Sequence, residues 1–71
     1  MTRQKQQDIE EVKGALIDAW RVEMVGGVTA ARKGLWSSWA SGYIYALSVN
    51  GLISLEVEKQ ALDFILWKSR R

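Results

Sequence analysis

Apolar residues recur at helical spacing in three segments of the chain, and each segment ends at residues typical of helix boundaries. In the first segment, from about residue 7 to 25, they return every three or four positions, which is the pattern of one buried helical face. Gly26-Gly27 ends the segment, because glycine readily takes the left-handed conformation that follows a helix. The residues of this face are Ile9, Val12, Leu16, Ala19 and Trp20.

The second and third helices are predicted over residues 29–50 and 55–69. Thr29 and Ser54 are side chains that cap helix N-termini, and Asn50-Gly51 followed by Leu52 fits a glycine-terminated helix end. No segment alternates with the period of a strand. We therefore predict an all-α fold, with three helices at about 7–25, 29–50 and 55–69 in one small bundle domain spanning 1–71, and a flexible tail at 1–6. The buried face of the third helix is expected to comprise Val57, Ala61, Phe64, Ile65 and Lys68, widened by Leu62 and Leu66.

Small residues recur every four positions along the second predicted helix, at Ala30, Gly34, Ser38, Gly42 and Ala46. This spacing places them on one ridge, where another helix can approach closely. Glycine inside a helix costs about 1 kcal/mol relative to alanine, so the ridge implies a steric need. Two interpretations stay open. The ridge packs against another helix of the same chain, as in any small bundle, or it packs against a second copy.

Bulky residues cover most of the remaining circumference of this helix, and its only charges are Arg32 and Lys33 in the first turn. A surface helix normally has one apolar stripe and one charged face. We therefore expect the helix to be buried nearly all round, which two neighbouring helices do not achieve, so that a homodimer completes the bundle. The expected dimer interface comprises Gly34, Trp36, Ser38, Trp39, Gly42 and Tyr43.

The composition excludes several kinds of chemistry. The 71 residues include no His, Cys or Pro. The chain therefore has no disulfide, no structural zinc site of the usual ligands and no His-dependent catalytic arrangement. Its carboxylates are spaced as on a solvated helix face. We expect a protein that is not an enzyme and that takes no cofactor or metal.

A membrane span is the next alternative, because residues 34–53 carry no charge. Twenty residues are long enough to cross a bilayer, but only six of these are Leu, Ile, Val or Phe, the residues that supply most insertion energy. The N-terminal segment also lacks the apolar core of a signal peptide. We expect a cytoplasmic protein that does not enter the membrane.

A DNA-binding regulator is the alternative function. The second and third helices, joined by a glycine turn, suggest a helix-turn-helix motif. The outward residues of the third helix would be Leu55, Glu56, Lys59 and Asp63, with Glu58 close by. Three carboxylates among them are of the wrong sign to face phosphates. The net charge of +2 is also small for a nucleic-acid ligand. We expect a protein or a protein–nucleic-acid complex as the partner instead, contacted by Arg21, Arg32, Lys33 and Trp67, and direct DNA binding stays the less favoured alternative.

One segment carries a family resemblance. Residues 42–58, Gly-Tyr-Ile-Tyr-Ala-Leu-Ser-Val-Asn-Gly-Leu-Ile-Ser-Leu-Glu-Val-Glu, resemble a pattern in small helical proteins of bacteriophages and integrated elements. The pattern is a helix ending at an Asn-Gly turn, then Leu-Ile-Ser and a helix with an acidic start. The resemblance covers about a quarter of the chain and assigns no functional residue. It implies a small phage-encoded protein that works in a bacterial host by binding a host protein, as an anti-CRISPR protein or an antagonist of a host regulator does.

Overall fold

Three α-helices form where the capping residues and the apolar spacing predict them. The computed structural model describes residues 6–71, with helices α1 (Ile9–Glu23), α2 (Ala30–Val49) and α3 (Leu55–Ser69). The predicted all-α fold is confirmed, and every helix end lies within about two residues of its predicted position, the usual margin for such boundaries. Of the expected tail, residues 1–5 lie outside the described residues. Gln6 is not free, since its Nε2 donates to the Gly51 carbonyl at 3.3 Å.

Each helix begins at a side chain that accepts a hydrogen bond from the backbone N–H three residues later. The acceptors are Asp8 Oδ1 at 2.9 Å, Thr29 Oγ1 at 3.1 Å and Ser54 Oγ at 3.2 Å. These contacts satisfy N–H groups that have no partner within the helix. The predicted N-caps at Thr29 and Ser54 are therefore confirmed.

The C-terminal end of α2 has the predicted glycine-terminated geometry. Gly51 has φ +70°, in the left-handed region that glycine adopts without a steric penalty. The Leu52 N–H donates to the Leu47 carbonyl at 2.8 Å, and the Gly51 N–H donates to the Ser48 carbonyl at 3.0 Å. This pair of bonds is the Schellman motif, and it turns the chain from α2 toward α3.

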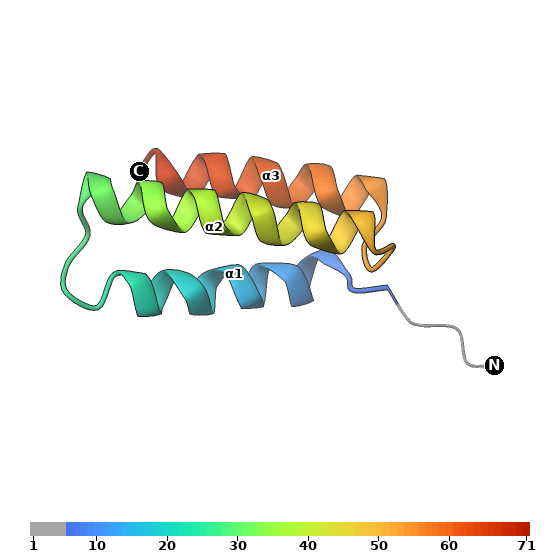
Figure 1. Ribbon diagram of the computed structural model, residues 1–71, viewed down its shortest axis with the longest axis horizontal. Coiled ribbons are helices and arrows are strands. Elements are labelled where there is room, and N and C mark those ends of the chain that lie inside the picture. Colours follow the sequence, from blue (N-terminus) through green and yellow to red (C-terminus); the bar gives the residue numbers. More distant parts are fainter. Residues whose placement is uncertain (1–5) are drawn as a thin grey trace.

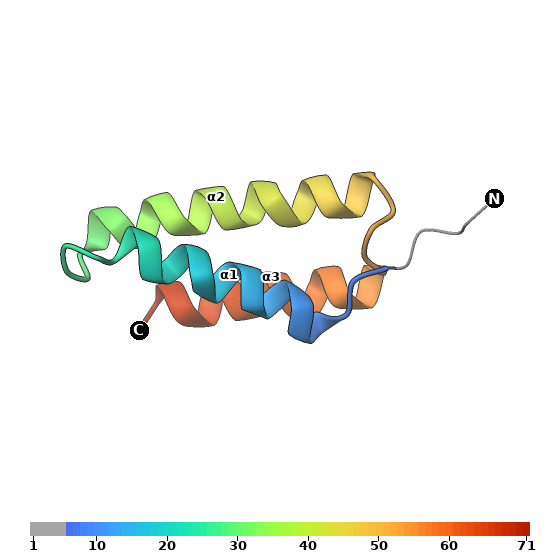
Figure 2. The ribbon, with the colours of Figure 1, turned by 90° about the horizontal axis from the view of Figure 1, so that it is seen from below.

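The three helices lie side by side along their length, as Figures 1 and 2 show from two directions. The chain runs along α1, returns along α2 and runs along α3 in the direction of α1, and each helix contacts both of the others. α2 and α3 are thus antiparallel neighbours. They do not cross steeply as the two helices of a DNA-binding helix-turn-helix do.

The core lies on the axis between the helices. It contains one aromatic side chain, Trp36, surrounded by aliphatic residues from all three helices and by one residue of the α2–α3 loop. Among the described residues no polar or charged side chain is buried, so the core is wholly apolar apart from the indole nitrogen. The buried residues are Val12, Leu16, Trp36, Ala40, Ile44, Leu47, Ile53, Ala61 and Ile65.

The apolar coverage of two helices differs from expectation. Leu62 and Leu66 do not widen the buried face of α3 and are exposed. α2 is not buried all round either, because α1 and α3 occupy only the side that carries Trp36, Ala40 and Ile44. None of the helices within residues 6–71 has both the length and the hydropathy that a bilayer span requires.

Candidate functional site

The side of α2 that faces away from the other helices carries no charge from Gly34 onward. Since the buried residues of α2 repeat at helical spacing, the residues between them face outward. We call this surface the α2 outer face. Its members are all exposed, and they are Gly34, Leu35, Ser38, Trp39, Gly42, Tyr45, Ala46 and Val49.

Large apolar side chains on this face flank the small residues. Leu35 is 63% exposed, Trp39 48%, Tyr45 68% and Val49 66%. A shallow depression of about 280 Å³ adjoins the face, between α1 and α2, where Leu35 and Trp39 form part of its wall. Single exposed apolar residues are ordinary, whereas a contiguous uncharged patch of this kind is a candidate interaction surface.

Four of the six residues expected at a dimer interface lie on the α2 outer face: Gly34, Ser38, Trp39 and Gly42. Tyr43 lies at its edge, half-buried, with its ring stacked on that of Trp39 at 5.1 Å between centroids and 8° between planes. The stack covers one side of the Trp39 indole and leaves the side chain 48% exposed.

Trp36 was expected at the dimer interface but lies in the core of the bundle. It is 2% exposed, and its Nε1 donates a 2.9 Å hydrogen bond to the Leu16 carbonyl of α1. The Trp20 ring packs edge-on against it, with 4.9 Å between ring centroids. Because the indole N–H is hydrogen-bonded and the ring is packed within one chain, Trp36 has almost no exposed surface that a second chain could contact.

The ridge of small residues on α2 lies on the surface of the bundle. All five, from Ala30 to Ala46, are exposed, and a Cβ built on Gly34 or Gly42 meets no atom within 4 Å. The first interpretation, close packing against another helix of the same chain, is therefore wrong. The cause is that α1 and α3 pack against the side of α2 that carries Trp36, Ala40, Ile44 and Leu47, which is not the side of the ridge.

The four expected partner contacts occupy different parts of the surface. Arg21 pairs with Asp18 of its own helix at 3.5 Å, and both side chains are largely exposed. Arg32 Nη1 donates to the Gly27 carbonyl at 2.9 Å and so holds the α1–α2 loop. Lys33 Nζ donates to the Arg71 carbonyl at the end of α3. Trp67 is 53% exposed on α3. Arg32 and Lys33 thus form hydrogen bonds within the chain, whereas Trp67 is exposed on the surface.

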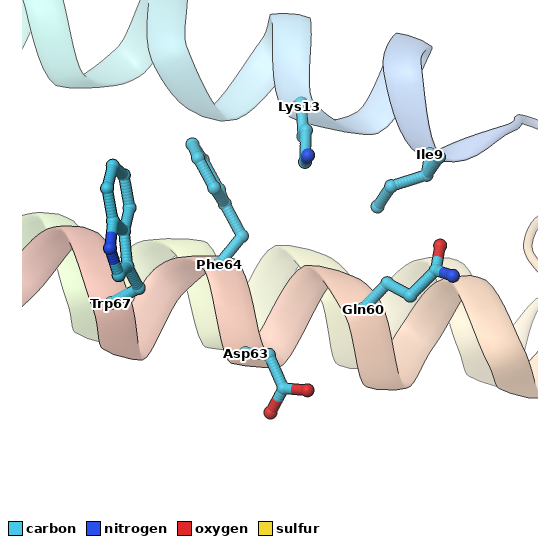
Figure 3. Close-up of a pocket in the computed structure, with 6 residues that line it drawn as sticks. All are labelled: Ile9, Lys13, Gln60, Asp63, Phe64 and Trp67. Carbon is cyan, nitrogen blue, oxygen red and sulfur yellow. The ribbon is translucent and has the colours of Figure 1, made fainter.

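A groove between α1 and α3 has a volume of about 480 Å³ and includes Trp67 in its lining. Figure 3 shows Ile9 and Lys13 reaching from α1 toward α3, and Phe64 and Trp67 rising from α3 toward α1. We call this surface the α1/α3 groove, and its lining residues are Ile9, Lys13, Gln60, Asp63, Phe64 and Trp67.

Sequence reasoning assigned Trp67 as a contact but missed the rest of the groove. Phe64 and Trp67 are three residues apart on a helix, and this spacing brings their rings together, with centroids 6.0 Å apart. That signal was available in the sequence. The position of Lys13 opposite them was not, because it depends on the side of α3 that α1 covers.

No side-chain cluster of the described residues has the composition of a metal site, since three neighbouring Asp or Glu side chains do not occur there. The α2 outer face is uncharged, whereas the α1/α3 groove combines three apolar residues with Lys13, Gln60 and Asp63. The chain has no significant match among protein-family models, curated proteins or solved structures, so the residues and geometry above are the basis for assigning its function.

Proposed function

We propose that this chain is a small non-enzymatic binding protein that forms a homodimer through the α2 outer face. The observation that carries the proposal is the exposure of Leu35, Trp39, Tyr45 and Val49 on one uncharged helix face. Together with the small residues between them, these side chains expose on the order of 500 Å² of apolar surface per chain. A typical stable interface buries about 800 Å² per partner. The patch is smaller than that of a typical stable interface but reaches the lower limit of about 1,000 Å² in total, so a reversible dimer is expected.

The absence of charge favours a second copy as the occupant. In a two-fold dimer the same patch meets itself, so every charge near the centre meets a like charge. From Gly34 to Val49, α2 has no charged residue and incurs no such cost. The small side chains at Ser38 and Gly42 allow the two α2 helices to cross closely, with Leu35 and Trp39 packing beside the crossing point.

The resemblance of residues 42–58 to small helical proteins of phages and mobile elements supports a proposal for the biological role. We propose that the protein is encoded by such an element and acts in the bacterial cytoplasm, where it inhibits or modulates a host protein by occluding its surface. This role requires no catalytic group. A host protein that co-purifies in a fixed ratio and loses activity when this chain is added would support it, and unchanged activity would refute it.

Sedimentation equilibrium tests the dimer. At micromolar to submillimolar concentration the wild-type chain should fit a reversible equilibrium between its 8.1 kDa monomer and a dimer. Gly42→Leu should shift the equilibrium to monomer, because the added side chain blocks the helix crossing. The variant should remain folded, since within residues 6–71 a Cβ at this position meets no atom within 4 Å apart from the adjacent backbone of α2 and its two chain neighbours.

Gly14→Leu is the matched control. Gly14 is an exposed glycine inside α1 with no atom within 4 Å of a built Cβ, and it lies away from the α2 outer face. Both substitutions raise helix propensity by about 1 kcal/mol. Only Gly42→Leu should weaken the dimer. A wild-type chain that stays monomeric throughout, or a Gly42→Leu variant that dimerises as tightly as wild type, would overturn the proposal.

A further inference from the structure

We propose that the α1/α3 groove binds an acidic peptide segment of a partner protein, with one bulky apolar side chain inserted beside Trp67. This inference rests on the proposed role as a binding protein, but it concerns a different surface and does not require the dimer. The apolar part of the site consists of Ile9, Phe64 and Trp67, which line an opening of about 480 Å³. That volume accommodates the side chain of a Leu or Phe together with its flanking backbone.

The cations in and beside the groove favour an acidic ligand. Lys13 lines the groove, and its Nζ lies 5.4 Å from the centre of the Phe64 ring. Arg71 and Lys68 are outside the lining: the Arg71 guanidinium lies 4.7 Å from the centre of the Trp67 ring, and Lys68 Nζ lies 4.4 Å from that of Trp20. None of these three cations forms an ion pair with a carboxylate of residues 6–71.

The carboxylate in the lining, that of Asp63, forms no ion pair with Lys13. Asp63 extends from α3 on the side away from α1, as Figure 3 shows, whereas Lys13 points into the space between the helices. Cations held over aromatic rings keep their charge and their remaining hydrogen-bond donors. Carboxylates at the rim of the groove are thus the complementary groups for Lys13 and Arg71.

The arrangement of the rings favours a peptide over single-stranded nucleic acid. Nucleic-acid platforms stack bases on free aromatic faces. Here Phe64 and Trp67 stack on each other, with an interplanar angle of 27°, while Lys13 lies over the Phe64 ring and Arg71 over the Trp67 ring. A base would have to displace one of these groups to stack on either ring, whereas an apolar side chain can pack against the exposed part of Trp67.

Selection from a random 12-residue peptide library on the immobilised full-length chain tests this inference. The enriched peptides should combine a bulky apolar residue with two or more Asp or Glu. Their affinity, measured by fluorescence anisotropy, should fall about tenfold or more in Trp67→Ala and in Lys13→Glu. Affinity should also fall as salt is raised, since the contacts include exposed charges.

Lys59→Glu is the matched control for Lys13→Glu. Lys59 is an exposed cation of α3 that does not line the groove, so the change in net charge is the same while the site is intact. The affinity of the Lys59→Glu variant for the selected peptides should stay within about twofold of wild type. The Lys13→Glu variant should sediment like wild type, because the α2 outer face is unchanged.

Four results would overturn the inference. They are enrichment of basic or uncharged peptides, no enrichment, equal loss of affinity in Lys59→Glu and Lys13→Glu, and binding of an oligothymidine that competes with the selected peptides.

Discussion

Ser48 Oγ donates a 2.9 Å hydrogen bond to Glu58 Oε1, joining the last turn of α2 to the first turn of α3. Both residues are half-buried, so the bond is partly shielded from water. A charged acceptor in such a position makes a stronger bond than a neutral one. The pair therefore helps to hold α2 and α3 side by side next to the loop that connects them.

The Ser48–Glu58 bond should appear as a coupling free energy of about 1 kcal/mol in a double-mutant cycle. The free energy of unfolding would be measured in urea, at low protein concentration, for wild type, Ser48→Ala, Glu58→Ala and the double variant. The cycle cancels the gain in helix propensity that alanine brings at each site. Single effects that add to within about 0.3 kcal/mol would contradict a contribution from this bond.

Two glycine substitutions should change stability in opposite directions. Gly51→Ala should destabilise the chain by about 1–2 kcal/mol, because Gly51 has φ +70° and a Cβ is strained in that conformation. Gly14→Ala should stabilise it by about 0.5–1 kcal/mol, because Gly14 is inside α1 with open space around it. Thermal unfolding of the two variants beside wild type measures both, and equal signs would contradict the assigned conformations.

Trp36→Phe should cost about 2–3 kcal/mol of unfolding free energy. The substitution removes the hydrogen bond from Nε1 to the Leu16 carbonyl and leaves unfilled volume against Trp20. Trp67→Phe is the control, since Trp67 is half-exposed and should change stability by less than about 0.5 kcal/mol. Similar losses in both variants would place Trp36 outside the core.

The N-cap of α3 should contribute about 1 kcal/mol. Ser54→Ala removes the acceptor of the Val57 N–H and should destabilise the chain by that amount. Ser54→Asp should recover the loss, because a carboxylate is an equally good cap and interacts favourably with the helix N-terminus. Urea unfolding of wild type, Ser54→Ala and Ser54→Asp measures these differences in unfolding free energy. A Ser54→Asp variant no more stable than Ser54→Ala would argue against capping.

Local chemistry determined the parts of the fold that could be predicted. The helix ends depend on a few neighbouring residues, such as Thr29, Ser54 and the Asn50-Gly51 pair, and these were located within two residues. The buried faces of α1 and α3 could be predicted from periodicity, since apolar residues recur there every three or four positions with polar residues between them.

The orientation of α2 could not be predicted in the same way. α2 has no charged residue after its first turn, so periodicity does not distinguish the side that faces inward. Trp36 and Trp39 are three residues apart and equally apolar, yet the first is in the core and the second on the surface. The α1/α3 groove was missed for a related reason, because Lys13 and Phe64 meet only through the packing of two helices far apart in the sequence.

The two ends of the bundle differ in how the backbone is secured. At one end, the Gln7 N–H donates to the Leu52 carbonyl at 2.8 Å, which ties the start of α1 to the α2–α3 loop. At the other end, the α1–α2 loop exposes Val25 and Val28 and is held by the Arg32 side chain. Local opening should therefore begin at the loop end, with α1 separating from there while its first turn stays attached. In amide hydrogen exchange, this order makes the Gln7 amide slower to exchange than those of residues 25–28.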